Sequence, residues 1–94
     1  MRYFLELAYD GTHYHGWQIQ PNARTVQEIL DDALSKVLRH PITSTGSGRT
    51  DSGVHASQQF VHFDLPEPIK DIPQLLYRLN KFLPKDIALK RLRP

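Results

Sequence analysis

The residues best suited to chemistry are gathered in one short run, from Gly46 to Ala56. Asp51 supplies a carboxylate, Arg49 a guanidinium and His55 an imidazole, and three glycines lie among them. Glycine adopts backbone angles that other residues avoid, so the run is predicted to form an irregular loop. Because Arg49 is two residues from Asp51, its charge favours the ionised carboxylate, which can act as a nucleophile or a base.

The same residue types also form ordinary surface turns, so Asp51 as a simple turn former is the alternative. Two known glycine-rich patterns do not fit. A phosphate-binding loop places Lys and Ser or Thr after its last glycine, where Val54 and His55 stand, and a dinucleotide fingerprint needs a glycine in place of Asp51. The Asp51–Gly53 tripeptide matches the Asp-Ser-Gly of aspartic proteases. Those enzymes are built almost wholly from strands, which the helical periodicity of this chain contradicts.

Length and composition indicate one small domain of 94 residues with a modest core. The absence of cysteine excludes disulfides and thiolate metal sites, and no apolar run reaches membrane-spanning length. We therefore expect a soluble, cytoplasmic protein without a membrane partner. The net charge is only +2, but the region after Arg78 is strongly basic. This end favours a polyanion, first of all a nucleic acid, although a solvated tail is the alternative.

Hydrophobic periodicity divides the chain into six elements. We expect strands at 2–10, 42–46, 56–64 and 86–93, and helices that begin at Thr25 and Asp71 and end before Pro41 and Pro84. Both helices start with a capping residue followed three positions later by Glu or Gln. The order strand, helix, strand, strand, helix, strand predicts an α+β, ferredoxin-like fold over residues 1–94, an antiparallel sheet with both helices on one face.

The same periodicity predicts which side chains face the core. In the first strand they are Tyr3, Leu5, Leu7 and Tyr9. Along the first helix Asp31 and Asp32 are expected on the side away from the apolar stripe, and along the second helix Phe82 is expected within the stripe. In the last strand we expect Ile87 and Leu89 on one face and Ala88 and Leu92 on the other.

A long loop, 10–24, separates the first strand from the first helix. Loops of this length in small domains are usually functional or disordered, and the aromatic residues Tyr14 and Trp17 argue for order. Trp17 could stack on a nucleobase or could plug the edge of the core, and both alternatives stay open. His13 and His15 resemble a metal-binding pair, but neither a cysteine nor a helical His pair supports a metal site.

Several motifs together resemble the tRNA pseudouridine synthase A family. The most specific is the run Gly48-Arg49-Thr50-Asp51-Ser52-Gly53-Val54-His55-Ala56. The others, in the same order as in that family, are Tyr9-Asp10-Gly11-Thr12, Gly16-Trp17-Gln18, Gln20-Pro21, Thr25-Val26-Gln27 and Leu83-Pro84-Lys85-Asp86-Ile87. The resemblance runs from one end of the chain to the other and is specific, because several independent motifs occur in order.

The resemblance implies an isomerase that converts uridine to pseudouridine in the anticodon arm of tRNA, without a metal or an organic cofactor. It implies that Asp51 is the nucleophile, which forms a covalent adduct while the uracil detaches, turns and rejoins through carbon. Arg49 would pair with Asp51 or fill the space of the flipped base. The other residues expected at the substrate are Thr50, His55, Gly16, Trp17 and Gln18.

The resemblance also implies parts that this chain does not match. Members of the family are longer, act as homodimers, and supply a tyrosine near the uracil and a basic partner for the aspartate from later segments. We therefore expect an N-terminal domain that carries the nucleophile and is inactive alone. A non-catalytic, ferredoxin-like RNA-binding module, in which Arg49 and the basic region contact phosphates, is the alternative.

Overall fold

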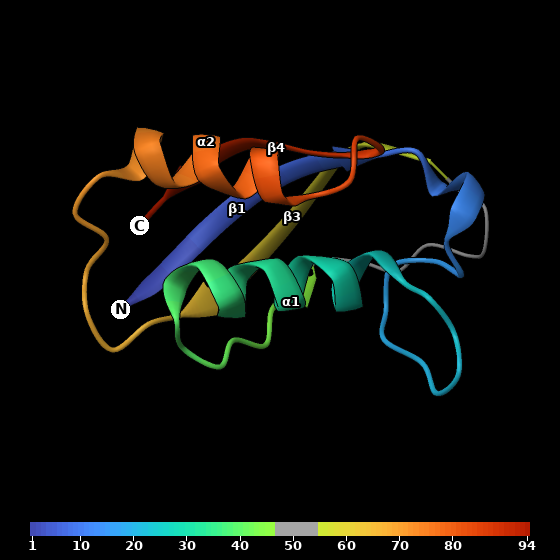
Figure 1. The fold of residues 1–94 in the computed structure, drawn as a ribbon, viewed down its shortest axis with the longest axis horizontal. Coiled ribbons are helices and arrows are strands. Elements are labelled where there is room, and N and C mark those ends of the chain that lie inside the picture. Colours follow the sequence, from blue (N-terminus) through green and yellow to red (C-terminus); the bar gives the residue numbers. More distant parts are fainter. Residues whose placement is uncertain (47–54) are drawn as a thin grey trace.

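The computed structural model describes residues 1–46 and 55–94. Within these two ranges it has two helices and four strands, with a short 3₁₀ helix, η1, after the first strand (Figure 1). Their bounds are β1 Arg2–Tyr9, η1 Gly11–His13, α1 Val26–Leu38, β2 Thr45–Gly46, β3 Ala56–Asp64, α2 Ile72–Phe82 and β4 Ile87–Arg93. No helix among the described residues has the length and apolar character needed to cross a membrane.

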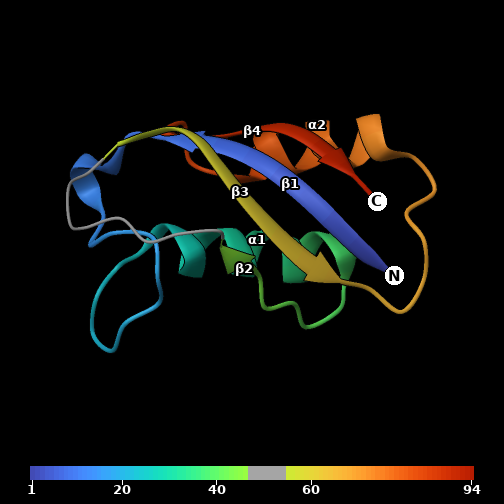
Figure 2. The same cartoon turned by 180° about the vertical axis from the view of Figure 1, so that it is seen from behind.

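The four strands form one antiparallel sheet in the order β2-β3-β1-β4. Both helices cover the same face, in front of the sheet in Figure 1 and behind it in Figure 2. This order, with each helix connecting two strands that are separated by one other strand, is the ferredoxin-like arrangement that the element order predicts. The α+β fold class is therefore confirmed.

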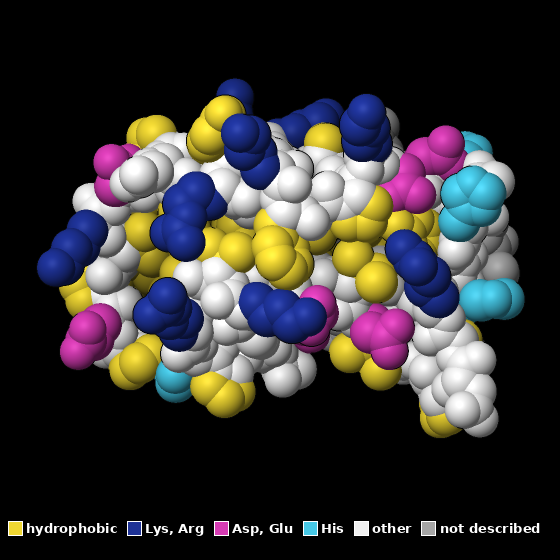
Figure 3. Space-filling model, viewed as in Figure 1, with side chains coloured by type: hydrophobic (Ala, Val, Ile, Leu, Met, Phe, Trp, Pro, Cys, Tyr) yellow, Lys and Arg dark blue, Asp and Glu magenta, His cyan; other side chains and the backbone are white. Residues whose placement is uncertain are grey.

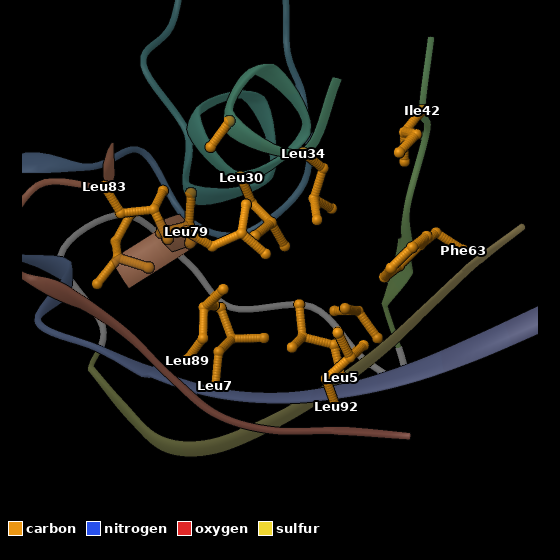
Figure 4. Close-up of a cluster of buried hydrophobic side chains, with 14 of the residues drawn as sticks. Leu5, Leu7, Leu30, Leu34, Ile42, Phe63, Leu79, Leu83, Leu89 and Leu92 are labelled. Atoms are coloured by element: carbon orange, nitrogen blue, oxygen red, sulfur yellow. The ribbon is translucent and has the colours of Figure 1, made fainter. Parts of the chain in front are cut away.

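The core lies between the sheet and the two helices. Leu5 and Leu7 of β1 point toward Leu30 and Leu34 of α1, and Leu79 of α2 closes the space between the helices (Figure 4). The alternation predicted for the first strand is confirmed, since every second side chain is buried. Apolar burial of this kind is the main favourable term in folding.

Both helices begin with the predicted side-chain caps. The Thr25 hydroxyl accepts a hydrogen bond from the Glu28 N–H at 3.4 Å, and the Asp71 carboxylate accepts one from the Gln74 N–H at 3.0 Å. These bonds satisfy N–H groups that have no partner within the helix. Helix α1 ends where Arg39 adopts a left-handed conformation with φ of 54°, two residues before Pro41.

Three predicted side-chain orientations, those of Leu92, Phe82 and Asp31, are wrong, and one predicted strand is too long. Leu92 faces the core with Leu89, because the pairing of β1 with β4 shifts register between Glu6 and Leu7 and interrupts the alternation. Phe82 is 50% exposed, since it lies at the last turn of α2 and turns away from the sheet. The expected strand over 42–46 shortens to the two residues of β2, because the preceding segment bonds to α1 instead.

Asp31 is the third of these residues, and it is buried rather than exposed. Its Oδ1 accepts hydrogen bonds from the Ser44 hydroxyl at 2.6 Å and from the Ser44 N–H at 3.2 Å. One turn further along α1, the Ser35 hydroxyl accepts a bond from the Ile42 N–H at 2.9 Å. The segment after α1 therefore runs back along the helix and covers Asp31, and this burial raises the pKa of its carboxyl to about 6.

The raised pKa of Asp31 makes a prediction about stability against pH. A carboxyl whose pKa is higher in the folded than in the unfolded chain stabilises the fold below the unfolded value and loses that contribution as pH rises. We expect the free energy of unfolding of the native sequence, relative to Asp31→Asn, to fall by up to about 3 kcal/mol between about pH 4 and pH 6, because one pKa unit corresponds to about 1.36 kcal/mol. Urea denaturation at a series of pH values measures this difference.

The neighbouring Asp32→Asn variant is the matched control. Asp32 forms an exposed ion pair with Lys36 at 3.1 Å on the same helix, and exposed pairs contribute little. Its profile should run parallel to that of the native chain. An Asp31→Asn profile that also runs parallel to the native one would contradict the assignment of a buried, proton-binding carboxyl.

Candidate active site

Three segments far apart in the sequence meet at one end of the sheet. Tyr9, the last residue of β1, pairs with Ala56 of β3 on one side and with Ile87 of β4 on the other. The next residue, Asp10, donates its backbone N–H to the carbonyl of Asp86 at 2.9 Å. Antiparallel pairing thus brings the end of β1 beside the starts of β3 and β4, opposite the end that holds both chain termini (Figures 1 and 2).

The His55 side chain contacts the chain at this end of the sheet. Its Nδ1 lies 2.9 Å from the backbone nitrogen of Gly11 and 3.0 Å from Oδ1 of Asp10. The imidazole is still 64% exposed, so it has room to contact a ligand as well as to hydrogen-bond to the protein. We expected His55 to lie at the substrate; the structure places it at the end of the sheet with Asp10, a residue that was not among the predicted site residues.

Asp10 shapes the chain immediately after β1. Its Oδ1 accepts hydrogen bonds from the Thr12 hydroxyl at 2.6 Å and from the Thr12 N–H at 3.0 Å, which makes it the N-cap of η1. These bonds hold the pKa of the Asp10 carboxyl below its usual value. Its presence in the Tyr9–Thr12 motif was the sequence signal that could have identified it.

A second polar contact links the long loop to the start of β4. The Tyr14 hydroxyl donates a hydrogen bond to Oδ1 of Asp86 at 2.6 Å, and the Arg24 guanidinium lies over the Tyr14 ring, 5.4 Å from its centroid. Burial and the bond to Asp86 raise the pKa of the Tyr14 phenol. The ring is only 1% exposed, so Tyr14 anchors the loop and does not present a stacking surface.

A cavity of about 430 Å³ opens beside His55, which is within the usual size for small-molecule sites. Its lining comprises Ala8, Tyr9, Asp10, His55, Ala56, Lys85, Asp86 and Ala88. The lining combines the small side chains of three alanines with the charged side chains of Asp10, Lys85 and Asp86. A flat, partly polar ring such as a nucleobase suits this combination. A cavity of about 480 Å³ at the other end of the domain is lined by residues such as Arg39 and Asp71.

Trp17 lies inside the domain rather than at its surface. Its indole is 2% exposed and packs against Gly46, where an added Cβ would lie 2.3 Å from Trp17 Nε1. Gly16 precedes it with φ of 84°, a left-handed conformation that favours glycine, whereas Gln18 is exposed. The burial favours packing over stacking for Trp17, so Gln18 is the member of this motif that can reach a ligand.

Gln27 joins the long loop to the chain before β2, a role the sequence did not reveal. Its side-chain oxygen accepts a bond from the Ile19 N–H at 3.0 Å, and its side-chain nitrogen donates to the Ser44 carbonyl at 2.7 Å. Its place in the Thr25–Gln27 motif was the signal that could have identified it. The two bonds fix the loop and the segment that leads to Gly46 relative to α1.

Asp51, Arg49 and Thr50 lie outside the described residues. Within the described residues, no group of three or more His, Cys, Asp or Glu side chains is arranged to hold a metal ion.

Comparison with known proteins gives a single, consistent result. A family model described as tRNA pseudouridine synthase matches residues 7–94. The relative from Bacteroides thetaiotaomicron is 54% identical over 92 residues, and that from Parabacteroides distasonis is 50% identical over 93 residues. A relative from Limosilactobacillus reuteri is 47% identical over 93 residues. All three are named tRNA pseudouridine synthase A.

These alignments cover nearly all of this chain but a minor part of each relative. They include 98%, 99% and 96% of the chain, in the order Bacteroides, Parabacteroides and Limosilactobacillus. They include 34%, 37% and 36% of the corresponding relatives. The chain therefore spans about a third of the length of the proteins it matches.

The contact between Gly46 and Trp17 yields a prediction about packing. In Gly46→Ala the new methyl group would overlap the indole, so we expect a loss of about 1–3 kcal/mol in unfolding free energy, as overpacked interiors show. In the Trp17→Phe background the smaller ring leaves room, so the same substitution should cost less. A double-mutant cycle by urea denaturation measures this coupling, and strictly additive effects would contradict the contact.

Proposed function

This chain belongs to the tRNA pseudouridine synthase family, and we propose that it carries the nucleophile, Asp51, of an enzyme that isomerises uridine to pseudouridine in the anticodon arm of tRNA. The observation that supports this most directly is the convergence at one end of the sheet. The motifs around Asp10, His55 and Asp86 are separate in sequence and meet beside the cavity that these three residues line.

The proposed chemistry conserves all atoms of the substrate. The bond from uracil N1 to the ribose C1′ breaks, a bond from uracil C5 to C1′ forms, the proton on C5 leaves, and N1 gains a proton. No electrons are lost or gained, so neither an oxidant nor a reductant is consumed. An ionised Asp51 can hold the substrate covalently while the ring turns, which splits one difficult step into two easier ones.

The remaining site residues take distinct proposed roles. Arg49, by its charge, keeps Asp51 ionised or fills the space that the extruded base leaves, since enzymes that act on a base in a stem must take it out of the stack. Thr50, next to the nucleophile in the sequence, and Gln18, exposed in the middle of the long loop, supply polar contacts to the substrate. Gly16 and Trp17 hold the long loop against the rest of the domain, since Trp17 is buried against Gly46.

Exposed basic and aromatic side chains suit a polyanionic substrate. On the helical face, Arg78 and Lys81 of α2 are exposed, and Lys and Arg side chains spread over this side in Figure 3. On the open face of the sheet, Phe4 and Phe60 are 48% and 45% exposed. Phosphate contacts from cations and stacking on aromatic rings are the common means of binding RNA. We propose that tRNA uses these side chains.

The whole-protein properties are proposals that rest on the family. The relatives are about three times as long as this chain, so their remaining sequence can supply further groups near the uracil. We propose that the tyrosine and the basic partner of Asp51 come from there, that the complete enzyme is a cytoplasmic homodimer, and that the 94 residues alone do not turn over. The functional assay therefore uses a chimera, in which this chain replaces the matching segment of a full-length relative.

The test replaces the matching third of the Bacteroides thetaiotaomicron relative with this chain and measures pseudouridine in unmodified tRNA. Release of tritium from uracil C5 reports each turnover, because that hydrogen leaves when the carbon–carbon bond forms. We expect the chimera to be active and Asp51→Asn, which keeps the shape but lacks the nucleophile, to lose at least about 10³-fold in turnover, since a reaction that depends on a covalent step cannot proceed without it.

Asp32→Asn, an exposed change on α1, is the control and should leave the rate unchanged. Binding of tRNA should persist in Asp51→Asn, because removing a negative charge does not weaken contact with a polyanion. An active chimera whose turnover survives Asp51→Asn would contradict the proposed role. A folded chimera that binds tRNA but forms no pseudouridine would favour the alternative, a non-catalytic RNA-binding module.

A further inference from the structure

We propose that His55 is a positioning residue, which holds the chain just after the nucleophile by accepting a hydrogen bond from the Gly11 N–H, and that it is not a group that touches the RNA. The proposal rests on the proposed function, because it concerns how Asp51 is placed for that reaction. It assigns a part in the site to Gly11 and Asp10, which were not among the predicted site residues.

The geometry at Nδ1 allows only one hydrogen bond at a time. This nitrogen lies 2.9 Å from the Gly11 nitrogen and 3.0 Å from Asp10 Oδ1. If Nδ1 carries a proton it donates to Asp10, and the Gly11 N–H then faces another N–H. If Nδ1 is unprotonated it accepts from Gly11, and the ring proton resides on Nε2.

The contacts around Asp10 favour the second state. Oδ1 of Asp10 already accepts two bonds from Thr12, at 2.6 and 3.0 Å, so it does not depend on His55 for a donor. The Gly11 N–H, in contrast, has His55 Nδ1 as its hydrogen-bond acceptor in the structure. By capping η1, Asp10 fixes the peptide that carries this N–H and so aims it at the imidazole.

The position of this bond in the chain gives it a consequence for catalysis. His55 is the fourth residue after Asp51 in the sequence, and the proposed role of its bond to the end of β1 is to help place the nucleophile. Displacement of a reacting group by about 1 Å can cost about 100-fold in rate. A distant backbone bond can therefore affect turnover without contacting the substrate.

Two other roles for His55 make different predictions. An imidazole that binds RNA would act through affinity, and one that transfers a proton would require a ring nitrogen that titrates. A positioning role requires only an acceptor at the place of Nδ1. Asparagine can put its side-chain oxygen near that place, whereas the longer glutamine puts its polar atoms nearer to Nε2, and alanine provides no acceptor.

The experiment uses the active chimera described above with His55→Asn, His55→Gln and His55→Ala. We expect His55→Ala and His55→Gln to lose about 10- to 100-fold in kcat with KM for tRNA changed by less than about 2-fold, and His55→Asn to stay within about 3-fold of the unsubstituted chimera. The control, His40→Asn, lies at the opposite end of the domain and should change neither value.

Two results would overturn the proposal. If His55→Asn is as impaired as His55→Ala, the ring itself is required, and if the loss appears in KM or in tRNA affinity, His55 contacts the RNA. These results leave the proposed function intact as long as the chimera forms pseudouridine and Asp51→Asn does not. An inactive chimera, in contrast, counts against the proposed function, and the hydrogen bond is then tested directly.

The direct test is nuclear magnetic resonance on the ¹⁵N-labelled 94-residue chain. A hydrogen bond from the Gly11 N–H to an unprotonated imidazole nitrogen transmits a scalar coupling between the two nitrogens. We expect this coupling between Gly11 and His55 Nδ1, and its loss in His55→Gln. A folded chain in which Nδ1 carries the proton, or in which no coupling to Gly11 is found, would overturn the proposal independently of any activity.

Discussion

The pairing of β1 with β3 on one side and β4 on the other is the constraint on which the rest of the structure depends. It places Tyr9 between Ala56 and Ile87, and so gathers three connecting segments at one end of the sheet. The same pairing directs alternate side chains of β1 onto the two helices, which builds the core. Because side chains alternate along a strand, a shift of one residue would reverse both the core face and the open face.

Local signals account for the parts of the fold that the sequence predicted. The caps at Thr25 and Asp71 lie within one helical turn of the groups they satisfy, and the alternation in β1 needs no information from elsewhere. The wrong predictions depend on tertiary contacts. The register shift that turns Leu92 inward arises from pairing with β1, and Asp31 is buried because a later segment folds back over α1.

The candidate site follows the same division. The motif around Asp51 allows a chemistry to be proposed, because its residue types and spacing are specific, and Asp51 itself lies outside the described residues. The hydrogen bonds that support the site could not be predicted, since the bond from Gly11 to His55 spans 44 residues and that from Tyr14 to Asp86 spans 72. Trp17 shows the limit most plainly: an aromatic residue in a polar loop suits a stacking role as well as a packing role, and only burial against Gly46 distinguishes them.

Native-state amide hydrogen exchange at the end of β1 tests most directly whether this end of the sheet is a rigid support for the loop. The Asp10 N–H bonds to the Asp86 carbonyl and the Gly11 N–H to His55, so both should exchange as slowly as amides within β1. The amide of Asn22, an exposed residue in the turn of the long loop, provides the fast reference. Exchange of Asp10 and Gly11 at the rate of Asn22 would contradict the account.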